Sequence, residues 1–410
     1  MSLAAAAPDA TNPSPAPARG RLAVSLGGGG ARAAYQVGVL RGIARRWPGL
    51  RFDILMGESS GAINAAFLAA HPGALGEAVE DLARLWGSLT SARVFRVDAP
   101  ALLRNGLRWL LRLVSGGSRL APGVRALLDT APLRDLLAST LGGSGEIPGI
   151  GRNLDRGRLS AVAVTTIDYA TGRTVSWVQG RDVTGWVRPL RRSVPALLSV
   201  EHVMASAALP LLFPAVRLGG SWHGDGGLRL HAPLSPAIHL GADRILAVST
   251  RWQAPATDTD LPETLAYPPP AQVAGLLLRA VFLDLLDQDA LALERVNRLL
   301  ESVPREAWDG LRPVRLCLLR PSQDLAQLAG RCEACLPRGV RFLTRGLGTH
   351  ETASPDLLGL LMFEPLYLQR LISLGEVDVE RRLPDIRALL EQEPRGPAAE
   401  GDQRPGSNVR

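Results

Sequence analysis

The sequence predicts an α/β fold in which a mainly parallel sheet carries helices on both faces. Short β-like runs alternate with helical patterns along the chain, and this alternation is typical of parallel strands joined by helical crossovers. The chain has 410 residues, of which 46% are apolar, so a large core can form. The expected strands cover residues 21–26, 51–56, 159–167, 173–178, 243–250 and 314–320.

The helical patterns justify this arrangement. "AAYQVGVLRGIARR" follows the first strand and "GAINAAFLAA" follows the second. Residues 267–272, "YPPPAQ", are a plausible linker before a more helical C-terminal part. Residues 1–20 are Ala/Pro-rich and the end of the chain is rich in polar residues, so we expect disordered tails at 1–20 and 393–410.

The charged residues indicate possible partners, and the absence of lysine excludes several kinds of chemistry. The formal net charge is +7, which suits anionic partners such as nucleic acid or acidic lipid headgroups. Every cation is an arginine, however, and this compositional bias weakens the inference. Without lysine the chain can have no P-loop lysine, no Schiff base and no Ser–Lys dyad.

Cysteine usage and hydropathy indicate a protein of a reducing compartment. The three cysteines, Cys317, Cys332 and Cys335, are too few for a disulfide framework. The pair Cys332 and Cys335 has no second pair of ligands nearby, so we expect free thiols and no metal. The first twenty residues lack the features of a secretory signal, and the apolar stretch 273–286 is interrupted by charges. We therefore expect a cytoplasmic protein without a transmembrane helix.

A serine lies between two glycines at the second strand-to-helix junction. Gly57-Glu58-Ser59-Ser60-Gly61 fits G-x-S-x-G, with the apolar run 52–56 before it and a helical pattern after it. In such a turn the central serine is strained and exposed for attack, and the flanking glycines relieve close backbone contacts. The alternative is a plain turn that contains serine. The strand–helix context favours Ser59 as a nucleophile.

A loop of four glycines follows the first strand and opens the next helix. Its backbone N–H groups suit an anion. A nucleoside triphosphate is excluded because no Gly-Lys-Ser/Thr follows. A dinucleotide fits Gly28, Gly30 and Ala33 loosely, but Asp53 begins the second strand, whereas a ribose-binding acid should end it. The remaining candidate is the oxyanion of acyl transfer. Arg32 is either a source of added positive charge or an ordinary surface arginine.

Asp225 is the candidate base. It lies between Gly224 and Gly226-Gly227, where the backbone can turn sharply and leave the carboxylate uncovered. Taken alone, the segment is best explained as a hairpin turn; an unpaired serine nucleophile and an oxyanion loop in the same chain favour a base. Such an aspartate needs its pKa raised by burial. A Ser–Asp/Glu–His triad would instead use His231, His239 or His350, none of which has a distinctive context.

These motifs together resemble those of the patatin-like phospholipases. The glycine loop with its basic residue, G-x-S-x-G and Asp-Gly-Gly occur in that family's order. Segments 205–216 and 165–177 are also similar to the family, and 357–375 resembles the tail of its longer bacterial members. Ala33 departs from the family's usual glycine, and Glu58 from its small residues.

The resemblance implies a three-layer α/β/α sandwich and a Ser–Asp dyad that needs no histidine, metal or cofactor. It places Ser59 as nucleophile and Asp225 as base, and it implies hydrolysis of fatty-acyl esters of lipids through an acyl-enzyme. The catalytic domain would span 21–240, with a C-terminal extension, 241–392, packed on it. The oxyanion loop would be Gly28, Gly29, Gly30 and Arg32, and the motif-supporting residues Gly57, Gly61, Gly226 and Gly227.

One segment has the pattern of a helix lying on a membrane. Residues 101–114 place Arg104, Arg108 and Arg112 four apart, beside leucines and Trp109. A cationic face next to leucine and tryptophan suits an anionic bilayer. An ordinary surface helix with its arginines in water explains the pattern equally well. The expected partners are thus a lipid or phospholipid substrate and, with this helix, an anionic membrane, but not nucleic acid.

Two other functions remain open from the sequence. The glycine loop and Asp53 could serve a nucleotide-dependent enzyme. A non-catalytic lipid-binding protein could also keep this fold, although the presence of both Ser59 and Asp225 argues against it.

Overall fold

The computed structural model describes most of the chain. The described residues are 20–97, 106–108, 111, 114–115, 126–143, 145–181, 183–230, 232–253, 269–282, 285–346, 348–351 and 355–391. The two predicted tails therefore lie outside the described residues, except for Gly20.

A single sheet runs through the described structure in the order β10-β9-β1-β2-β3-β4-β6-β5, with β7 and β8 attached to it. Strands β10, β9, β1, β2 and β3 are mutually parallel, and β4 turns back antiparallel to β3. The strands are β1 (Leu22–Leu26), β2 (Ile54–Glu58), β3 (Ala161–Asp168), β4 (Arg173–Gly180), β5 (Val187–Arg188), β6 (Arg191–Pro195), β7 (Val216–Leu218), β8 (Ser221–Asp225), β9 (Arg244–Val248) and β10 (Arg315–Leu319).

Helices cover both faces of this sheet, as the sequence predicts. The α-helices are α1 (Ala34–Arg46), α2 (Ser60–Ala70), α3 (Leu75–Gly87), α4 (Ser91–Val94), α6 (Ala131–Leu141), α7 (Pro148–Asp155), α8 (Val200–Ser206), α9 (Ser235–His239), α10 (Pro270–Phe282), α11 (Leu285–Glu301), α12 (Leu325–Arg331), α13 (Arg338–Gly346), α14 (Asp356–Leu361), α15 (Pro365–Arg381) and α16 (Leu383–Glu391). Short 3-10 helices are η1 (Gly30–Ala33), η2 (Gly226–Arg229), η3 (Arg305–Ala307), η4 (Glu333–Cys335) and η5 (Thr349–Glu351).

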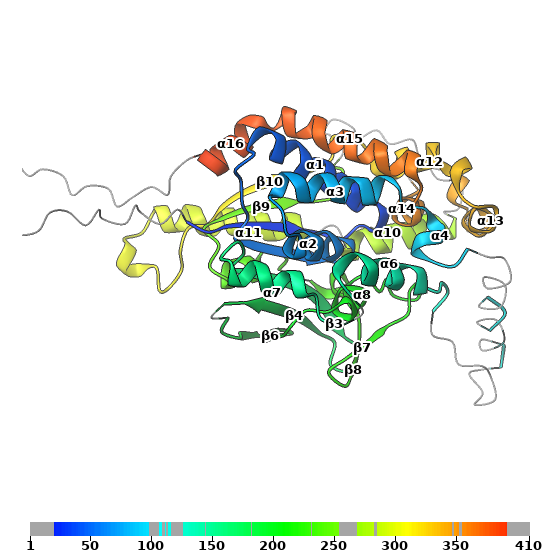
Figure 1. Ribbon diagram of the computed structural model, residues 1–410, viewed down its shortest axis with the longest axis horizontal. Helices are drawn as coiled ribbons and strands as arrows, with labels where there is room; N and C mark the ends of the chain where they lie inside the picture. Colours follow the sequence, from blue (N-terminus) through cyan, green and yellow to red (C-terminus); the bar gives the residue numbers. More distant parts are fainter. Residues whose placement is uncertain are drawn as a thin grey trace, which may run out of the picture.

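Two hydrophobic cores define the three layers. The larger core joins one face of the sheet to α1, α2, α3, α8 and α15, and the smaller one joins the opposite face to α9 and α11. Alternate residues of β1 belong to different cores: Leu22, Val24 and Leu26 to the larger, Ala23 to the smaller. Figure 1 shows α15 lying along α1 on the outer side of the sheet. The predicted α/β fold is confirmed.

Every strand expected from the sequence is present, with ends shifted by up to three residues. The short strands β5 to β8 were not predicted. Each has five residues or fewer, and β8 pairs with β3 over only three positions. Such strands have too little periodicity to stand out in a sequence.

The chain beyond residue 240 completes the sheet and contributes to both of its helical layers. Strand β9 pairs with β1, and β10 pairs with β9. Helix α15 packs so closely on α1 that a Cβ at Gly38 would lie 2.0 Å from the carbonyl oxygen of Ile372. The predicted linker 267–272 lies partly outside the described residues, and α10 begins within it, at Pro270.

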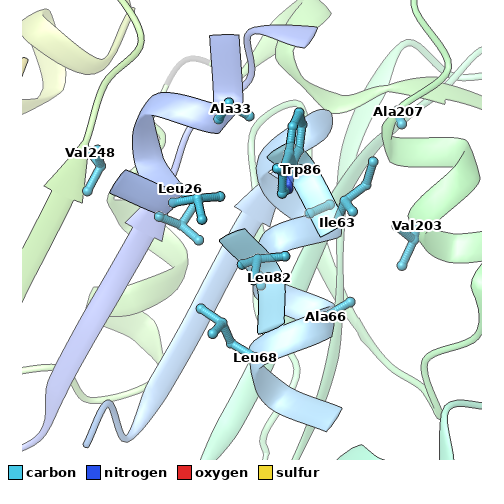
Figure 2. Close-up of a cluster of buried hydrophobic side chains, with 14 of the residues drawn as sticks. Leu26, Ala33, Ile63, Ala66, Leu68, Leu82, Trp86, Val203, Ala207 and Val248 are labelled. Carbon is cyan, nitrogen blue, oxygen red and sulfur yellow. The ribbon is translucent and has the colours of Figure 1, made fainter. Parts of the chain in front are cut away.

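The larger core holds α2 between α3 and α8. Figure 2 shows Trp86 of α3 beside Ile63 of α2, with Val203 and Ala207 on the other side. The indole N–H of Trp86 donates to Asn64 Oδ1 at 2.7 Å, so this polar atom is satisfied within the core. The helix that follows Ser59 is thereby fixed from both sides.

Candidate active site

Ser59 alone makes the connection between β2 and α2. The strand ends at Glu58 and the helix begins at Ser60. The backbone of Ser59 has φ of 53° and ψ of −130°, outside the regions favoured by L-residues. This conformation costs about 1–3 kcal/mol and recurs at functional sites. The positive end of the α2 dipole lies at this residue, where it favours a developing negative charge.

Close backbone contacts require the two glycines of the motif. A Cβ at Gly57 would lie 2.3 Å from the carbonyl oxygen of Gly61, in agreement with the predicted close approach. A Cβ at Gly61 would lie 2.1 Å from the carbonyl oxygen of Leu26 at the end of β1. The second glycine is therefore required by the neighbouring strand, which the sequence did not indicate.

The sheet register brings Asp225 to the end of β2. One edge of β3 pairs with β4 along its whole length. On its other edge, β2 runs parallel to residues 161–165 and β8 runs antiparallel to residues 166–168. Glu58 lies opposite Thr165, and Asp225 lies opposite Thr166. The carboxyl ends of β2 and β8 thus meet, and Ser59 and Asp225 become neighbours.

Asp225 is fully buried, and burial raises the pKa of its carboxyl to about 7. Its interactions with the Ser59 side chain and with the N–H of Gly227, which donates to Oδ1 at 3.0 Å, lower the pKa by less. A Cβ at Gly226 would lie 2.4 Å from the carbonyl oxygen of Thr165, so the next residue must be glycine. A carboxylate with a pKa near neutrality is suited to accept a proton.

Ser206 of α8 fixes the backbone of Ser59, a role that was not predicted from the sequence. The N–H of Ser59 donates to Ser206 Oγ at 2.9 Å, and the Ser206 hydroxyl donates to the carbonyl oxygen of Thr165 at 2.7 Å. All three residues are buried. The available signal was the position of Ser206 within segment 205–216, which resembles the family.

Gly28 lies against Ser59, but its backbone polar groups already have hydrogen-bond partners. A Cβ at Gly28 would lie 3.0 Å from Ser59 Cβ. The Gly28 N–H donates to Glu58 Oε1 at 3.2 Å, and the Gly28 carbonyl accepts from Thr250 Oγ1 at 2.7 Å. The expectation that Gly28 supplies an oxyanion donor therefore differs from the geometry, in which its N–H binds a carboxyl group.

The backbone N–H groups of the next two glycines, Gly29 and Gly30, are available to bind a ligand. Among the hydrogen bonds of the described residues, none uses the N–H of Gly29 or Gly30. Their φ angles are 155° and 56°, and a Cβ at Gly30 would lie 2.2 Å from the carbonyl oxygen of Leu360. Gly30 lines the same pocket as Ser59. The loop can thus offer two backbone donors to an anion beside the serine.

Arg32 points away from this anion site. Its guanidinium binds the carboxylate and the carbonyl oxygen of Asp356, each at 2.8 Å, and the side chain is only 4% exposed. Arg32 lines a separate pocket together with Trp252 and Leu325. Its positive charge is therefore paired with Asp356 rather than placed at Ser59, and its contact fastens η1 to α14.

Glu58 is a second buried carboxyl group beside Ser59 and Asp225. The pKa of the Glu58 carboxyl is raised to about 8, mainly by burial and in part by the nearby Asp225 carboxylate. The hydrogen bond from the Gly28 N–H lowers this pKa, but by less. Two carboxyl groups this close repel each other when both are ionised. Ionisation of Asp225 therefore disfavours ionisation of Glu58, whose pKa is the higher of the two.

An apolar pocket opens beside Ser59. Its cavity volume is about 30 Å³, and its walls come from α2, α3, α6 and the segment after α8. Apart from Ser59, Ser60 and the backbone of Gly30, the lining is apolar; it includes Ile63, Trp86, Leu133, Leu137, Leu209 and Phe213. A larger pocket lies near the start of β2, but it contains neither Ser59 nor Asp225.

The histidines that could complete a triad lie elsewhere or outside the described residues. His239 stacks on Trp186, with ring centroids 4.9 Å apart. His350 belongs to η5, and His231 is outside the described residues. The groups that act on the Asp225 carboxyl in the described structure include no histidine.

Asp53 does not face the glycine loop. Its carboxylate accepts the N–H of Leu22 at 2.8 Å, at the start of β1. Because β1 and β2 are parallel, this is the end of the sheet opposite the loop. The acid that would bind a ribose in a dinucleotide site is therefore engaged elsewhere.

Only part of the predicted membrane-facing helix is described. Arg104, Trp109 and Arg112 lie outside the described residues. Arg108 is exposed, and so are Leu107 and Leu111, at 51% and 47%. In the part of the chain that the structure describes, no helix has both the length and the apolar character needed to span a bilayer.

The fold and the site define a three-layer α/β/α protein with a buried aspartate beside a strained serine. A family model described as patatin-like phospholipase matches residues 24–238, more than half of the chain. The chain therefore belongs to the patatin-like phospholipase family. No curated protein matches it.

Solved structures that are similar to the chain include the following three. Human GIVD cytosolic phospholipase A2 is 12% identical, with 90% of this chain and 59% of that one covered and a TM-score of 0.44. VipD from Legionella pneumophila is 14% identical, with 75% and 62% covered and a TM-score of 0.33. The type III effector ExoU is 16% identical, with 90% and 79% covered and a TM-score of 0.27. The chain thus spans about three fifths of the length of the first two.

Proposed function

We propose that the protein is a serine acyl hydrolase that cleaves fatty-acyl esters of lipids, including phospholipids, through an acyl-enzyme. The observation that carries the proposal is the meeting of Ser59 and Asp225 at the facing ends of β2 and β8. Family membership supports the same chemistry. Ser59 is the nucleophile and Asp225 is the general base.

The proposed reaction has two steps. Ser59 Oγ attacks the ester carbonyl carbon while its proton passes to the Asp225 carboxylate. The carbonyl oxygen becomes an oxyanion, which the N–H groups of Gly29 and Gly30 stabilise. The C–O bond then breaks, the leaving alcohol takes the proton, and an acyl-Ser59 ester remains. Water attacks this ester in the second step while Asp225 accepts its proton. The bond between the acyl carbon and Ser59 Oγ then breaks, Oγ takes the proton back from Asp225, and the fatty acid is released.

The apolar pocket supports a lipid as the acyl donor. A fatty-acyl chain carries no polar group, so a lining of leucine, isoleucine and aromatic side chains can bury it without an unmet hydrogen bond. The pocket begins at Ser59 and runs between α2, α3 and α6. The cavity is only about 30 Å³, so a bound chain would have to part these apolar side chains, and it would then present its ester group to the serine.

We also propose peripheral contact with an anionic bilayer through residues 101–114. The exposed Leu107, Leu111 and Val114 of this segment would enter the interface, and its arginines would meet lipid phosphates. Replacing Arg104, Arg108 and Arg112 with glutamine should weaken binding to anionic vesicles in co-sedimentation and spare hydrolysis of a soluble short-chain ester. Unchanged vesicle binding would refute this contact.

A fluorophosphonate probe with an alkyl chain tests the catalytic proposal. We expect wild type to be labelled on the peptide containing Ser59, and Ser59→Ala to be unlabelled. Asp225→Asn should react about 100-fold more slowly or worse, because general-base catalysis typically contributes 10²–10⁴-fold. Ser88→Ala, an exposed serine outside the pocket, is the matched control and should react like wild type.

Two results would contradict the proposal. Labelling of Ser59→Ala at the wild-type rate would mean that another residue is the nucleophile. Folded wild type that neither reacts with the probe nor hydrolyses any phospholipid or short-chain ester would favour a non-catalytic lipid-binding protein. Saturable binding of NAD(P) would instead favour a nucleotide-dependent enzyme.

A further inference from the structure

The peptide groups around Gly28 are held from both sides by buried side chains. Its N–H donates to Glu58 Oε1 at 3.2 Å, and its carbonyl accepts from Thr250 Oγ1 at 2.7 Å. On the preceding peptide, the carbonyl of Gly27 accepts from Gln36 Nε2 at 2.7 Å. Glu58 and Thr250 are 8% and 1% exposed. Glycine leaves the backbone of a loop free to adopt many conformations, so contacts that hold this loop in one conformation need an explanation.

The Thr250 contact determines where the next N–H points. The Gly28–Gly29 peptide is trans, as are the other peptide bonds of the described structure. In a trans peptide the C=O and the following N–H point in opposite directions. A hydroxyl that holds the Gly28 carbonyl on one side therefore directs the Gly29 N–H to the other. Rotation of this peptide would move that donor away from the serine.

Thr250 also leaves no room for a side chain at Gly29. A Cβ at Gly29 would lie 2.4 Å from Thr250 Oγ1 and 3.0 Å from its Cβ. Thr250 thus packs directly against Gly29, and its hydrogen bond to the Gly28 carbonyl is buried, where it meets little competition from water. A residue needed only to fill space would not require the hydroxyl.

We propose that Thr250 and Glu58 are positioning residues that clamp the Gly28 peptide groups and thereby aim the Gly29 and Gly30 N–H groups at the oxyanion. This inference rests on the proposed acyl-hydrolase function. Thr250 lies two residues beyond β9, outside the 24–238 segment that the family model matches. The C-terminal extension accordingly supplies part of the catalytic geometry without touching the substrate.

The clamp explains why a glutamate can precede the nucleophile. A protonated Glu58 binds the Gly28 N–H through one oxygen and brings no negative charge next to the oxyanion loop. Its Oε2 is buried and has no hydrogen-bond partner among the described residues. A buried carboxylate in that position would be costly and would repel the oxyanion.

Thr250→Val, compared with Thr250→Ser, tests the clamp. Valine keeps the shape but removes the hydroxyl, whereas serine keeps the hydroxyl. Loss of a whole oxyanion donor costs about 10²–10³-fold in kcat. We expect Thr250→Val, which misdirects one donor, to lower kcat on a soluble short-chain ester about 10- to 100-fold with KM within about twofold, and Thr250→Ser to recover most of it.

A control and a second variant keep this test decisive. Thr344→Val removes another buried threonine hydroxyl, which donates to the carbonyl oxygen of Arg341 within α13, away from the Ser59 pocket, and should leave kcat unchanged. Glu58→Leu should lower kcat in the same way as Thr250→Val, and Glu58→Gln, whose amide oxygen still accepts the Gly28 N–H, should retain most activity at pH 7. Active sites are counted with the fluorophosphonate probe, so loss of folded protein does not mimic loss of kcat.

The outcomes separate this inference from the proposed function. If Thr250→Val and Glu58→Leu both turn over at the wild-type rate while Ser59→Ala is inactive, the hydrolase stands and the clamp is wrong. If both raise KM and leave kcat unchanged, they act on substrate binding and the clamp is again wrong. If Ser59→Ala is as active as wild type, the proposed function itself fails.

Discussion

Replacing Asp225 by asparagine should make the protein more stable, and increasingly so as the pH rises. The carboxyl is fully buried, and burial raises its pKa from 3.8 to about 7. An acid whose pKa is higher in the folded state binds more protons there than in the unfolded chain. Asp225 therefore causes no loss of stability below about pH 4, and the loss that it causes grows as the pH rises to about 7.

The size of the effect follows from the same values. Each pKa unit is worth 1.36 kcal/mol, so the rise from 3.8 to about 7 removes about 4 kcal/mol of folding free energy above pH 7. Asparagine does not ionise and avoids this loss. The difference between Asp225→Asn and wild type should then grow by about 4 kcal/mol between pH 4 and pH 8. Any fixed cost of burying the amide is the same at both ends of this range.

Urea denaturation at several pH values measures this difference directly. Midpoints multiplied by the m-value give the free energy of unfolding for both proteins at each pH. A matched comparison uses Asp135→Asn, because Asp135 is an exposed residue of α6 and its replacement should leave the pH profile of stability nearly unchanged. A pH-independent difference for Asp225→Asn would show that Asp225 is not a desolvated acid, and the argument for its role as base would fail with it.

Three further predictions concern residues around the dyad. Gly61→Ala should lower the free energy of unfolding by about 3 kcal/mol, because its Cβ would meet the β1 backbone. Gly151→Ala, in open space within α7, should raise it by about 0.5–1 kcal/mol. Urea unfolding of both variants tests these two values. Ser206→Ala should lower kcat about tenfold with little change in KM, since the Ser59 N–H loses its acceptor; equal kcat values would contradict this. Wild-type kcat/KM should rise with pH through about 7 as Asp225 ionises and fall through about 8 as Glu58 ionises. Glu58→Gln should lose only the fall at alkaline pH. A Glu58→Gln profile identical to that of wild type would contradict the assignment of the alkaline limb to Glu58.

The residues found from the sequence are those whose role is set by their immediate neighbours. Ser59 was identified because a strained turn needs glycines two positions away on either side. Asp225 was identified from its flanking glycines, and the resemblance strengthened both assignments. The α/β fold followed in the same way, because alternating strands and helices are a local pattern repeated along the chain.

The supporting residues were missed because their role depends on distant partners. Ser206 meets Ser59 across 147 positions, and Thr250 meets Gly28 across 222. Neither stands in a pattern that a short window of sequence can distinguish from an ordinary helix or loop. Arg32 shows the converse problem, because its motif suggested a site for the substrate while its guanidinium binds Asp356, 324 positions away.

These long-range contacts also explain how the protein tolerates an unfavourable active site. A strained serine and two buried carboxyl groups each lower the stability of the folded state. The opposing contribution comes from the surrounding frame, in which β9 pairs with β1 and α15 packs along α1. Because the same frame carries Thr250 and Asp356, the contacts that stabilise the fold also hold the glycine loop in place. Under the proposed function, the C-terminal extension is therefore part of the catalytic unit, although the family motifs all lie before it.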